Sequence, residues 1–341
     1  MNNSNTVIPL KVSVNNKKKL LFTEAEISQS LKALCYRFKL YIPINNVGDE
    51  VKWEVLPGDD VIMEDEQGVL LIGQVDTVSS QINAVGGKLA VTGRCKLANF
   101  VDSSAPHVPG EYRNISLESL AEELVSPFGF KIKADDKASK PIDSIQINAG
   151  KTCFEVIERL ARSAGVVPRS NGIDTLLLDQ LKEEILPYQL EEGVNIIEGS
   201  GSVSVAQRYS TITVVGQAAG TSDKSGEDTT SIKGEAYDSE VNHSRRLVIV
   251  AEDESTPESL NTRAKWAVEA RKARGTSLNL TVQGWRDEGG NLWELGQHVM
   301  VNAPTLAPKG KYRITGITRT LNDRGSQTRL EFTDSSGYSL S

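Results

Sequence analysis

Two segments near opposite ends of the chain follow the same pattern. In the first, Trp53-Glu precedes Gly58, and strand-like sequence continues to residue 93. In the second, Trp293-Glu precedes Gly296, and strand-like sequence continues to residue 333. In both, apolar residues stand three and five positions after the glycine, and a strand with an apolar-X-Gly pattern follows. The pattern favours two related β-rich domains. The tryptophan-to-glycine distances differ by two residues, so chance similarity between small β-hairpins is the alternative.

The length of the chain supports several domains. At 341 residues it exceeds the size at which a single core stops growing, about 250–300 residues, so we expect two to four domains. Apolar residues make up 38% of the chain, which is enough to fill those cores. We predict an α+β fold that is mainly β. A first β-barrel-like domain would occupy residues 1–100, a small α/β domain 101–185, and a second β-barrel-like domain with an inserted helix 186–341.

The first domain shows mostly strand signals. Residues 7–14 alternate between apolar and polar side chains, as a half-buried strand does, and Lys17 to Lys19 then favour the tip of a β-turn. Residues 24–34 carry apolar side chains at helix-compatible spacing, which predicts a short helix. Residues 51–94 predict several strands joined by tight turns.

The middle segment shows helix boundaries. Ser116 and Ser119 are candidate caps of one helix, and Ser119 has capping-box spacing to Glu122. Thr152, with a glutamate three residues later, predicts the start of a second helix that runs to residue 164. Asn171-Gly172 lies between two apolar runs and predicts a hairpin turn.

The last segment returns to strands with one helix among them. Residues 209–215 alternate as a strand does. Residues 216–240 are rich in Gly, Ser, Thr, Asp and Lys and predict a mobile loop. Residues 255–274 predict a helix that is capped by Ser255 or Thr256 and ends before Gly275. Strand patterns continue over residues 276–336.

The charge balance argues against two classes of partner. The net charge of −7 and the pI near 5.3 do not fit electrostatic capture of nucleic acid or of an anionic membrane, because that requires clustered positive charge. The basic residues of the helix at 261–274 also suit the negative end of its dipole. No apolar run reaches 18 residues and no signal peptide is visible. We therefore expect no stable membrane insertion, and we expect the protein to fold in a cytoplasm.

Cysteines and histidines offer little for chemistry. Cys35, Cys95 and Cys153 are odd in number and lack CxxC spacing, which favours buried free thiols over a disulfide framework or a zinc site. The histidines are too few and too scattered to form a metal-ligand motif, and structural roles are favoured for all of them. They are His107, His243 and His298. Phosphate-loop, dinucleotide and nucleophile-elbow motifs are absent from the sequence.

Adjacent acidic residues occur at several places and could in principle flank a scissile glycosidic bond. They are Asp59-Asp60, Asp135-Asp136, Glu183-Glu184 and Glu191-Glu192. Neighbouring carboxylates in turns are more typical of solvated surface. Glu64-Asp65-Glu66 lacks the length and ligand order of a calcium loop. We therefore predict that the protein is not an enzyme and has no catalytic, cofactor-binding or metal-binding residue.

Four blocks together resemble one family, the central baseplate hub proteins of contractile-tailed phages of the Mu type. The first, residues 93–105, is similar to the family's Gly-Arg…Asp-Leu-Val-Asp-Cys-Ser-Ala segment, although Asn99-Phe100 stands in place of Asp-Leu and Ser103 in place of Cys. The other blocks follow in the family's order. They are residues 152–165, 208–217 and 293–332.

The resemblance implies a virion structural protein of the tail baseplate, encoded by a phage or prophage and assembled in the host bacterial cytoplasm. It implies a homotrimer in which two barrel-like domains per chain form a ring of six modules. Such a ring would adapt a threefold spike to a sixfold tail tube. The implied partners are the tail spike protein, the tail tube and other baseplate proteins. Two alternatives stay open from the residues alone: a tail-associated peptidoglycan hydrolase that uses Asp59 or Asp60, and a monomeric carbohydrate-binding β-protein.

Overall fold

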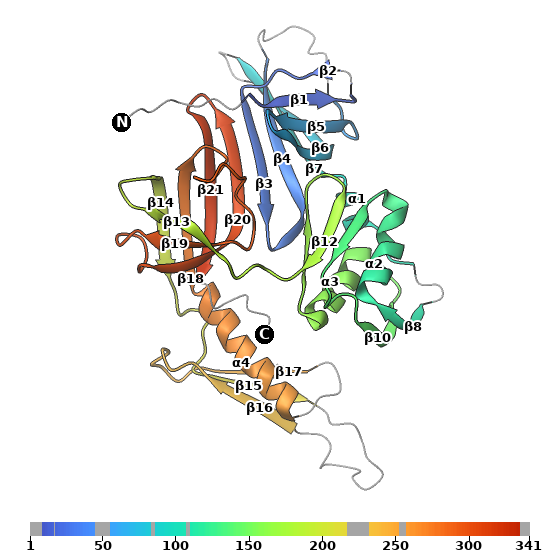
Figure 1. Cartoon of the computed structure of the whole chain (residues 1–341), viewed down its shortest axis with the longest axis vertical. Helices are drawn as coiled ribbons and strands as arrows, with labels where there is room; N and C mark the ends of the chain where they lie inside the picture. Colours follow the sequence, from blue (N-terminus) through green and yellow to red (C-terminus); the bar gives the residue numbers. More distant parts are fainter. Residues whose placement is uncertain are drawn as a thin grey trace.

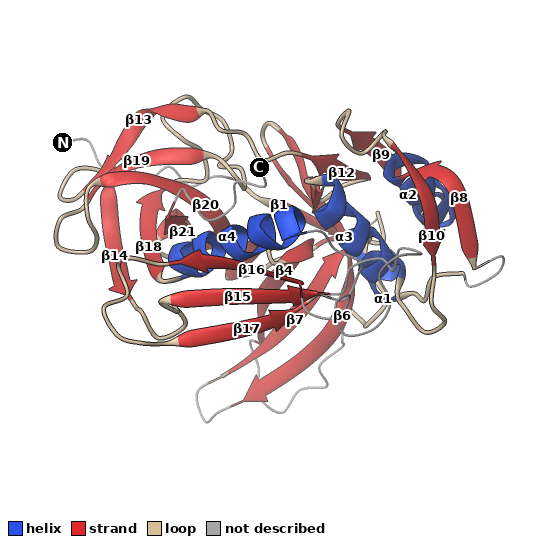
Figure 2. Ribbon diagram, turned by 90° about the horizontal axis from the view of Figure 1, so that it is seen from below, coloured by secondary structure: helices blue, strands red, loops and turns tan. Residues whose placement is uncertain are grey.

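The structure is a computed structural model, and it describes residues 9–16, 18–44, 55–82, 86–106, 110–216, 232–251 and 257–334. It is mainly β with a few helices, so the predicted α+β, mainly β fold class is confirmed (Figures 1 and 2). One large sheet of thirteen strands dominates the molecule. Three smaller sheets belong to two units that lie beside and below it in Figure 1.

The large sheet follows one main path with a side branch. Its strands are, in spatial order, β14 (Ile196–Val203), β18 (Thr276–Gln283), β21 (Gly325–Asp334), β20 (Gly310–Asn322), β3 (Glu24–Ser30), β4 (Ala33–Ile44), β7 (Gly87–Cys95), β6 (Gly68–Ile82), β5 (Asp60–Asp65), β1 (Lys11–Val14) and β2 (Lys18–Lys19). The branch contains β19 (His298–Asn302), which pairs with β20, and β13 (Ile185–Glu191), which pairs with β19. Among the described strands these pairings form an open path. The two barrel-like domains are therefore open modules that share a sheet.

Each module has its own core. We call β3 to β7 the first module, and β14 with β18 to β21 the second module. The first core includes Leu40, Val61 and Leu71, and the second includes Leu280 and Val299, all of them fully buried. The alternation of buried and exposed side chains along these strands places one face of the sheet inward.

A small α/β unit connects the two modules. This connecting unit contains α1 (Ala98–Asp102), β8 (Glu111–Ser116), α2 (Leu117–Val125), a 3₁₀ turn (Ser126–Phe128), β9 (Lys131–Ala134), β10 (Pro141–Gln146), α3 (Cys153–Ala164), β11 (Val167–Ser170) and β12 (Thr175–Asp179). Both predicted helices are present. The Ser116 side chain caps α2, and Thr152 forms the predicted capping box of α3 with Glu155. The predicted hairpin at Asn171-Gly172 joins β11 and β12.

A second unit is inserted between β14 and β18. This inserted unit contains β15 (Thr211–Gly216), β16 (Ile232–Tyr237), β17 (Arg246–Val250) and α4 (Pro257–Arg274). β15 pairs antiparallel with β16 and parallel with β17, and α4 packs on one face of this sheet around buried Ile212, Val214 and Leu260. The predicted helix is confirmed at α4. Its suggested caps, Ser255 and Thr256, lie outside the described residues.

Two local predictions for the N-terminal segment are wrong. Residues 24–30 form strand β3 instead of a helix, because this segment lies between β20 and β4 and bonds to both. Lys18 and Lys19 are paired in β2, and the turn is made by Asn15 and Asn16, whose φ angles of 51° and 56° suit asparagine. Lys17 lies outside the described residues.

The loop predicted over residues 216–240 is also partly wrong. Gly216 ends β15, and residues 232–237 form β16. The buried face of β16 consists of Gly234 and Ala236, so its burial is not visible as a hydrophobic pattern. A Cβ on Gly234 would lie 2.3 Å from the backbone nitrogen of Asn261, so α4 can pack this closely only against glycine. Residues 217–231 lie outside the described residues.

Candidate interaction surfaces

The two modules share one turn in atomic detail. Gly58 and Gly296, matched by the sequence pattern, both adopt left-handed φ angles of 93° and 86°. The N–H of Gly58 donates to the carbonyl oxygen of Val75 at 2.8 Å, and the N–H of Gly296 donates to that of Ile314 at 2.9 Å. These two glycines are therefore structural equivalents. Trp53, the other anchor of the pattern, lies outside the described residues.

The hairpin that follows has the same register in both modules. In the first module β6 pairs with β7 from Gly73, opposite Cys95, with an irregularity between Val75 and Thr77. In the second module β20 pairs with β21 from Tyr312, opposite Asp334, with an irregularity between Ile314 and Gly316. The strand orders β3-β4-β7-β6-β5 and β14-β18-β21-β20-β19 also correspond. Such agreement in order and register identifies a structural repeat.

The repeat is joined by strand pairing within the chain. β20 of the second module pairs antiparallel with β3 of the first, from Gly316 opposite Ser30 to Leu321 opposite Ala25. We call this pairing the internal junction. On the same edge, the first residues of β20 pair with β19 instead. The internal junction makes the two modules one continuous sheet, visible between the blue and red strands of Figure 1.

Buried polar groups fix the internal junction. Arg319 is only 4% exposed, and its guanidinium donates to the carbonyl oxygen of Trp293 at 2.6 Å. Burial lowers the pKa of Arg319 and raises the pKa of nearby Tyr36. A second link crosses between the modules, where Arg286 donates to the buried Asp65 carboxylate at 2.5 Å. A buried charge that loses its partner is strongly destabilising, so these contacts fix the position of one module relative to the other.

Asp65 thus has a structural role. Its other carboxylate oxygen accepts from the N–H groups of Gln67 and Gly68 in the turn between β5 and β6. In the described part of the chain no group of three or more His, Cys, Asp or Glu residues could hold a metal ion.

The acidic pairs singled out in the sequence hold local structure at separate places. Asp59 accepts from the N–H of Leu56, and Asp60 pairs with Lys96 at 2.7 Å. Asp135 accepts from both nitrogens of Gln180, which lowers the pKa of Asp135.

The remaining pairs lie next to the second module. Glu191 accepts from Asn302, and Glu192 accepts from the N–H of Thr305. Glu183 binds the fully buried Arg313 at 2.6 Å.

Of the two histidines among the described residues, His298 is fully buried. It begins β19, and neither ring nitrogen has a hydrogen-bond partner. Burial, followed by the positive charges of Arg313 and Lys311, lowers the pKa of His298 to about 4. The imidazole is therefore neutral at pH 7. His243 is exposed, and His107 lies outside the described residues.

Besides the outer edges of β2 and β13, two further strand edges of the large sheet are open in the described part of the chain. Residues 77–82 of β6 pair with β7 on one side only, because β5 ends its pairing at Gln74. β14 pairs with β18 on one side only. Exposed apolar side chains mark both edges: Ile82 is 70% exposed and Val203 is 64% exposed. The sequence reasoning missed these edges, because exposure of a strand edge depends on its neighbours in space.

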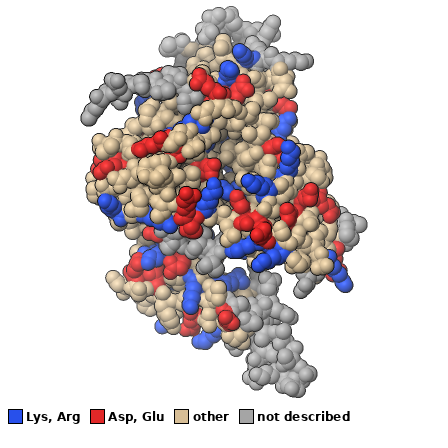
Figure 3. Space-filling view, viewed as in Figure 1, with Lys and Arg blue, Asp and Glu red and all other residues tan. Residues whose placement is uncertain are grey.

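The inserted unit presents a different surface. α4 covers one face of its sheet (Figure 2). The other face carries Tyr237, Val248 and Val250, each more than 60% exposed. Over the face of the molecule drawn in Figure 3, acidic and basic side chains are interspersed. None of the described helices is both long enough and apolar enough to cross a bilayer.

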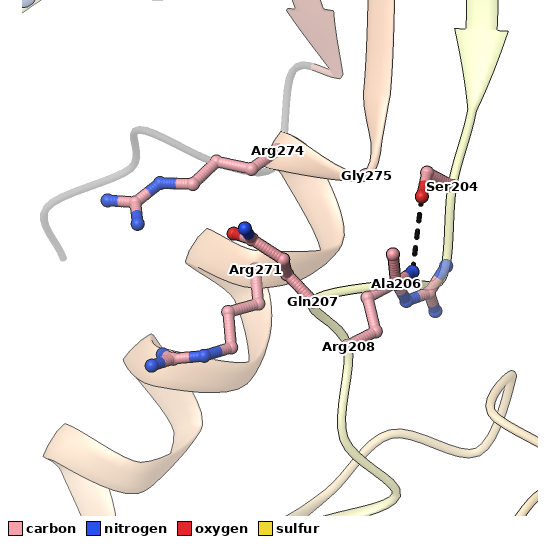
Figure 4. Close-up of a pocket in the computed structure, with 7 residues that line it drawn as sticks. All are labelled: Ser204, Ala206, Gln207, Arg208, Arg271, Arg274 and Gly275. Atoms are coloured by element: carbon pink, nitrogen blue, oxygen red, sulfur yellow. Dashed lines mark hydrogen bonds between the residues drawn. The ribbon is translucent and has the colours of Figure 1, made fainter.

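A hollow of about 300 Å³ lies where the inserted unit joins β14 and β18. Figure 4 shows Arg271 and Arg274 extending from the last turns of α4 beside it. Arg208, which also lines it, is bound to Asp238 at 2.7 Å and to Glu240 at 2.8 Å. The buried pair of Arg208 and Asp238, with the more exposed Glu240 beside it, fixes the base of the inserted unit.

A duplicated strand core, with one unit between its copies and another within the second copy, defines a modular, β-rich structural protein. Comparison with known proteins identifies which kind. Residues 98–180 match the second domain of gp44-like baseplate hub proteins, 208–267 the third domain of NMB1110-like tail proteins, and 256–341 the fourth domain of the Mu phage baseplate assembly protein GpP.

Whole-chain relatives agree with these matches. The baseplate hub protein gp44 of Escherichia phage Mu is 25% identical over 326 residues, which cover 93% of this chain and 85% of that protein. The 43 kDa tail protein of prophage MuSo2 from Shewanella oneidensis is 25% identical, with a TM-score of 0.84 over 96% of this chain and 98% of that one. The tail protein from Neisseria meningitidis MC58 shares the fold, with 19% identity and a TM-score of 0.80 over 97% and 98% of the chains.

The resemblance to Mu-type baseplate hub proteins is confirmed. The chain is a structural component of a phage tail baseplate and is not an enzyme. Ser103, which stands where the resemblance implied a cysteine, follows α1. Its hydroxyl donates to the carbonyl oxygen of Asn99 at 2.6 Å. The segment thus keeps a local structural role.

Proposed function

We propose that the protein is the trimeric central hub of the baseplate, which adapts a threefold spike to a sixfold tail tube. The observation that carries this proposal is the structural repeat. Each chain supplies two modules with the same strand order and register, so three chains supply six modules. A closed ring of six similar modules offers near-sixfold symmetry from a threefold assembly.

The other units supply the threefold character of the proposed hub. The connecting unit and the inserted unit each occur once per chain, so a trimer displays three of each. In Figure 1 the inserted unit projects from the lower end of the molecule, away from the top of the large sheet. We assign the ring of modules to the tail tube, and the spike and other baseplate proteins to surfaces of these two units.

The sequence predicted one domain over residues 186–341, and we propose two units there. The inserted unit has a separate core, so we divide residues 186–341 into the second module and the inserted unit. The proposal assigns no catalytic residue, cofactor or metal to the chain. It places the protein in the tail baseplate after assembly in the host cytoplasm.

Light scattering of the purified chain at micromolar concentration tests the proposal. A particle of three times 37.1 kDa is expected. A monomer at micromolar concentration would refute the proposal of a trimeric hub. Obligate interfaces of this kind bury roughly 2,000 Å² or more, so the trimer should persist on dilution.

A further inference from the structure

The internal junction is a template for a contact between chains. At this junction Leu321 lies opposite Ala25, and Ile317 lies opposite Gln29, all four at most 9% exposed. β20 contributes the half-strand that extends beyond its partner β19, and β3 contributes its whole outer edge. Every element of this junction has a counterpart elsewhere in the chain, because the modules repeat.

The counterparts of the two junction strands are the open edges. The half-strand of β20 corresponds to residues 77–82 of β6, which extend beyond β5 in the same way. β3 corresponds to β14, since each pairs with the next strand of its own module, β4 or β18, in the same antiparallel sense. Within one chain the β6 edge and the β14 edge belong to different modules and are not paired with each other.

The composition of both edges favours pairing. Proteins usually protect an open strand edge with charged residues or proline. Residues 77–82 read Thr-Val-Ser-Ser-Gln-Ile and residues 199–204 read Gly-Ser-Gly-Ser-Val-Ser, without a charge or a proline in either. No described strand pairs with the outer side of either segment, and Ile82 and Val203 expose apolar surface that pairing would cover.

We propose that residues 77–82 of one chain pair antiparallel with residues 199–204 of a second copy, forming the contact that closes the trimeric ring. This proposal rests on the trimer proposed above and adds the surface and the register. Three such contacts would alternate with three internal junctions, so that all six modules are joined by the same strand pairing. A heterologous contact of this kind closes a ring and covers both the β6 edge and the β14 edge.

The internal junction sets the register of the proposed contact. Ile317 opposite Gln29 corresponds to Val78 opposite Val203, which gives an apolar cross-strand pair. Thr320 opposite Glu26 corresponds to Gln81 opposite Ser200 on the outer face of the sheet. A slip of one residue would turn each side chain to the other face, so this register is a specific prediction.

Cysteine crosslinking tests the register. In the variant Gln81→Cys/Ser200→Cys the two thiols of neighbouring chains would be directly opposed, with Cα atoms about 4.5–5.5 Å apart, within the range of a disulfide. The matched control Thr77→Cys/Ser200→Cys keeps one site and moves the other. Its thiols would be about 13 Å apart along the strand, which is too far. The native cysteines are buried and should not interfere.

Each variant is oxidised at a concentration where light scattering has given its mass, and is then separated under non-reducing denaturing conditions. Covalent dimers and trimers, but no larger species, are expected from the first variant and not from the control. A trimer that crosslinks no better than the control would overturn the strand pairing and leave the hub proposal standing. Covalent species beyond three chains would overturn the closed ring. A monomeric mass would overturn the hub proposal itself.

Discussion

Replacing His298 with glutamine should reduce the pH dependence of stability in the second module. The imidazole is fully buried, and positive Arg313 and Lys311 face it from β20. The Glu183 carboxylate lies 3.7 Å from its Nδ1, but Glu183 is largely exposed and does not offset the burial. The folded protein therefore keeps His298 neutral in mildly acidic solution, where an unfolded chain protonates it.

The magnitude follows from the two pKa values. The pKa is about 4 in the folded protein, compared with 6.5 for an unperturbed histidine. Above pH 6.5 His298 is largely neutral in both the folded and the unfolded state, so it does not reduce stability. As the pH falls toward 4, the unfolded state binds the proton and the folded state does not, so the folded state loses stability. Between pH 7 and pH 5 this linkage removes about 2 kcal/mol. Burial raises the pKa of Glu183, but the hydrogen bond and positive charge of Arg313, together with the charge of Lys311, bring that pKa below its usual value, so Glu183 titrates below this window.

Urea unfolding at pH 7 and pH 5, followed by tryptophan fluorescence at one protein concentration, measures the effect. The parent should lose about 2 kcal/mol more than His298→Gln between the two pH values. The control His243→Gln removes an exposed histidine and should keep the pH dependence of the parent. If the parent and His298→Gln lose the same stability, the buried neutral imidazole is not the cause and the reasoning fails.

Three further substitutions probe the modules and the connecting unit. Gly93→Ala should lower the free energy of unfolding by about 1–3 kcal/mol, seen as a lower urea midpoint, because the new Cβ would lie 2.1 Å from the carbonyl oxygen of Gln74. Thr152→Ala should cost about 1 kcal/mol in thermal or urea unfolding, because the N–H of Glu155 loses its acceptor. Val203→Asp should shift the trimer toward monomer in light scattering, because it places a charge on the proposed contact between chains.

Each of these substitutions has a matched control elsewhere in the chain. A Cβ on Gly86 would meet nothing within 4 Å, so Gly86→Ala should have a much smaller effect than Gly93→Ala. Ser163→Ala removes a hydroxyl from the last turn of α3, at the opposite end from the Thr152 cap. Val248→Asp adds the same charge to the inserted unit, away from the proposed contact. Equal effects in substitution and control would contradict the assigned cause in each case.

Local signals in the sequence were sufficient where the structure is locally determined. Thr152 and Gly165 bound α3 as predicted, since a capping box and a left-handed glycine act within one helical turn. For α2 the sequence left Ser116 and Ser119 open, and the structure selects Ser116, which accepts from the N–H of Ser119. These elements follow from contacts that are close in sequence.

Strand β3 shows where that information ends. Its residues fit a helical spacing, but they also alternate, and the buried positions are Ala25, Ile27 and Gln29. The choice is made by β20 and β4, which bond to both edges of the segment. Pairing with β20, almost 300 residues away in the sequence, has no local signature.

The repeat was detectable from sequence, but its alignment was only partly correct. Gly58 and Gly296 are equivalent because the same turn requires a left-handed residue. The apolar-X-Gly patterns that follow are not equivalent, since the hydrogen-bonded register places Tyr312, and not Gly316, at the position of Gly73. Glycine marks a backbone conformation reliably, whereas a short apolar pattern can recur at a shifted position along any strand.

The differences between equivalent positions fit the two kinds of junction that we propose. Arg319 and Gln29 are buried at the internal junction, where they form once during folding of a single chain. The corresponding positions at the proposed contact between chains are Ser80 and Val203. A buried guanidinium there would have to stay hydrated in the free protomer and lose that water on each association, which is costly. A small hydroxyl and an apolar side chain avoid this penalty, so the same strand pairing can serve as a permanent join within a chain and as an assembly contact between chains.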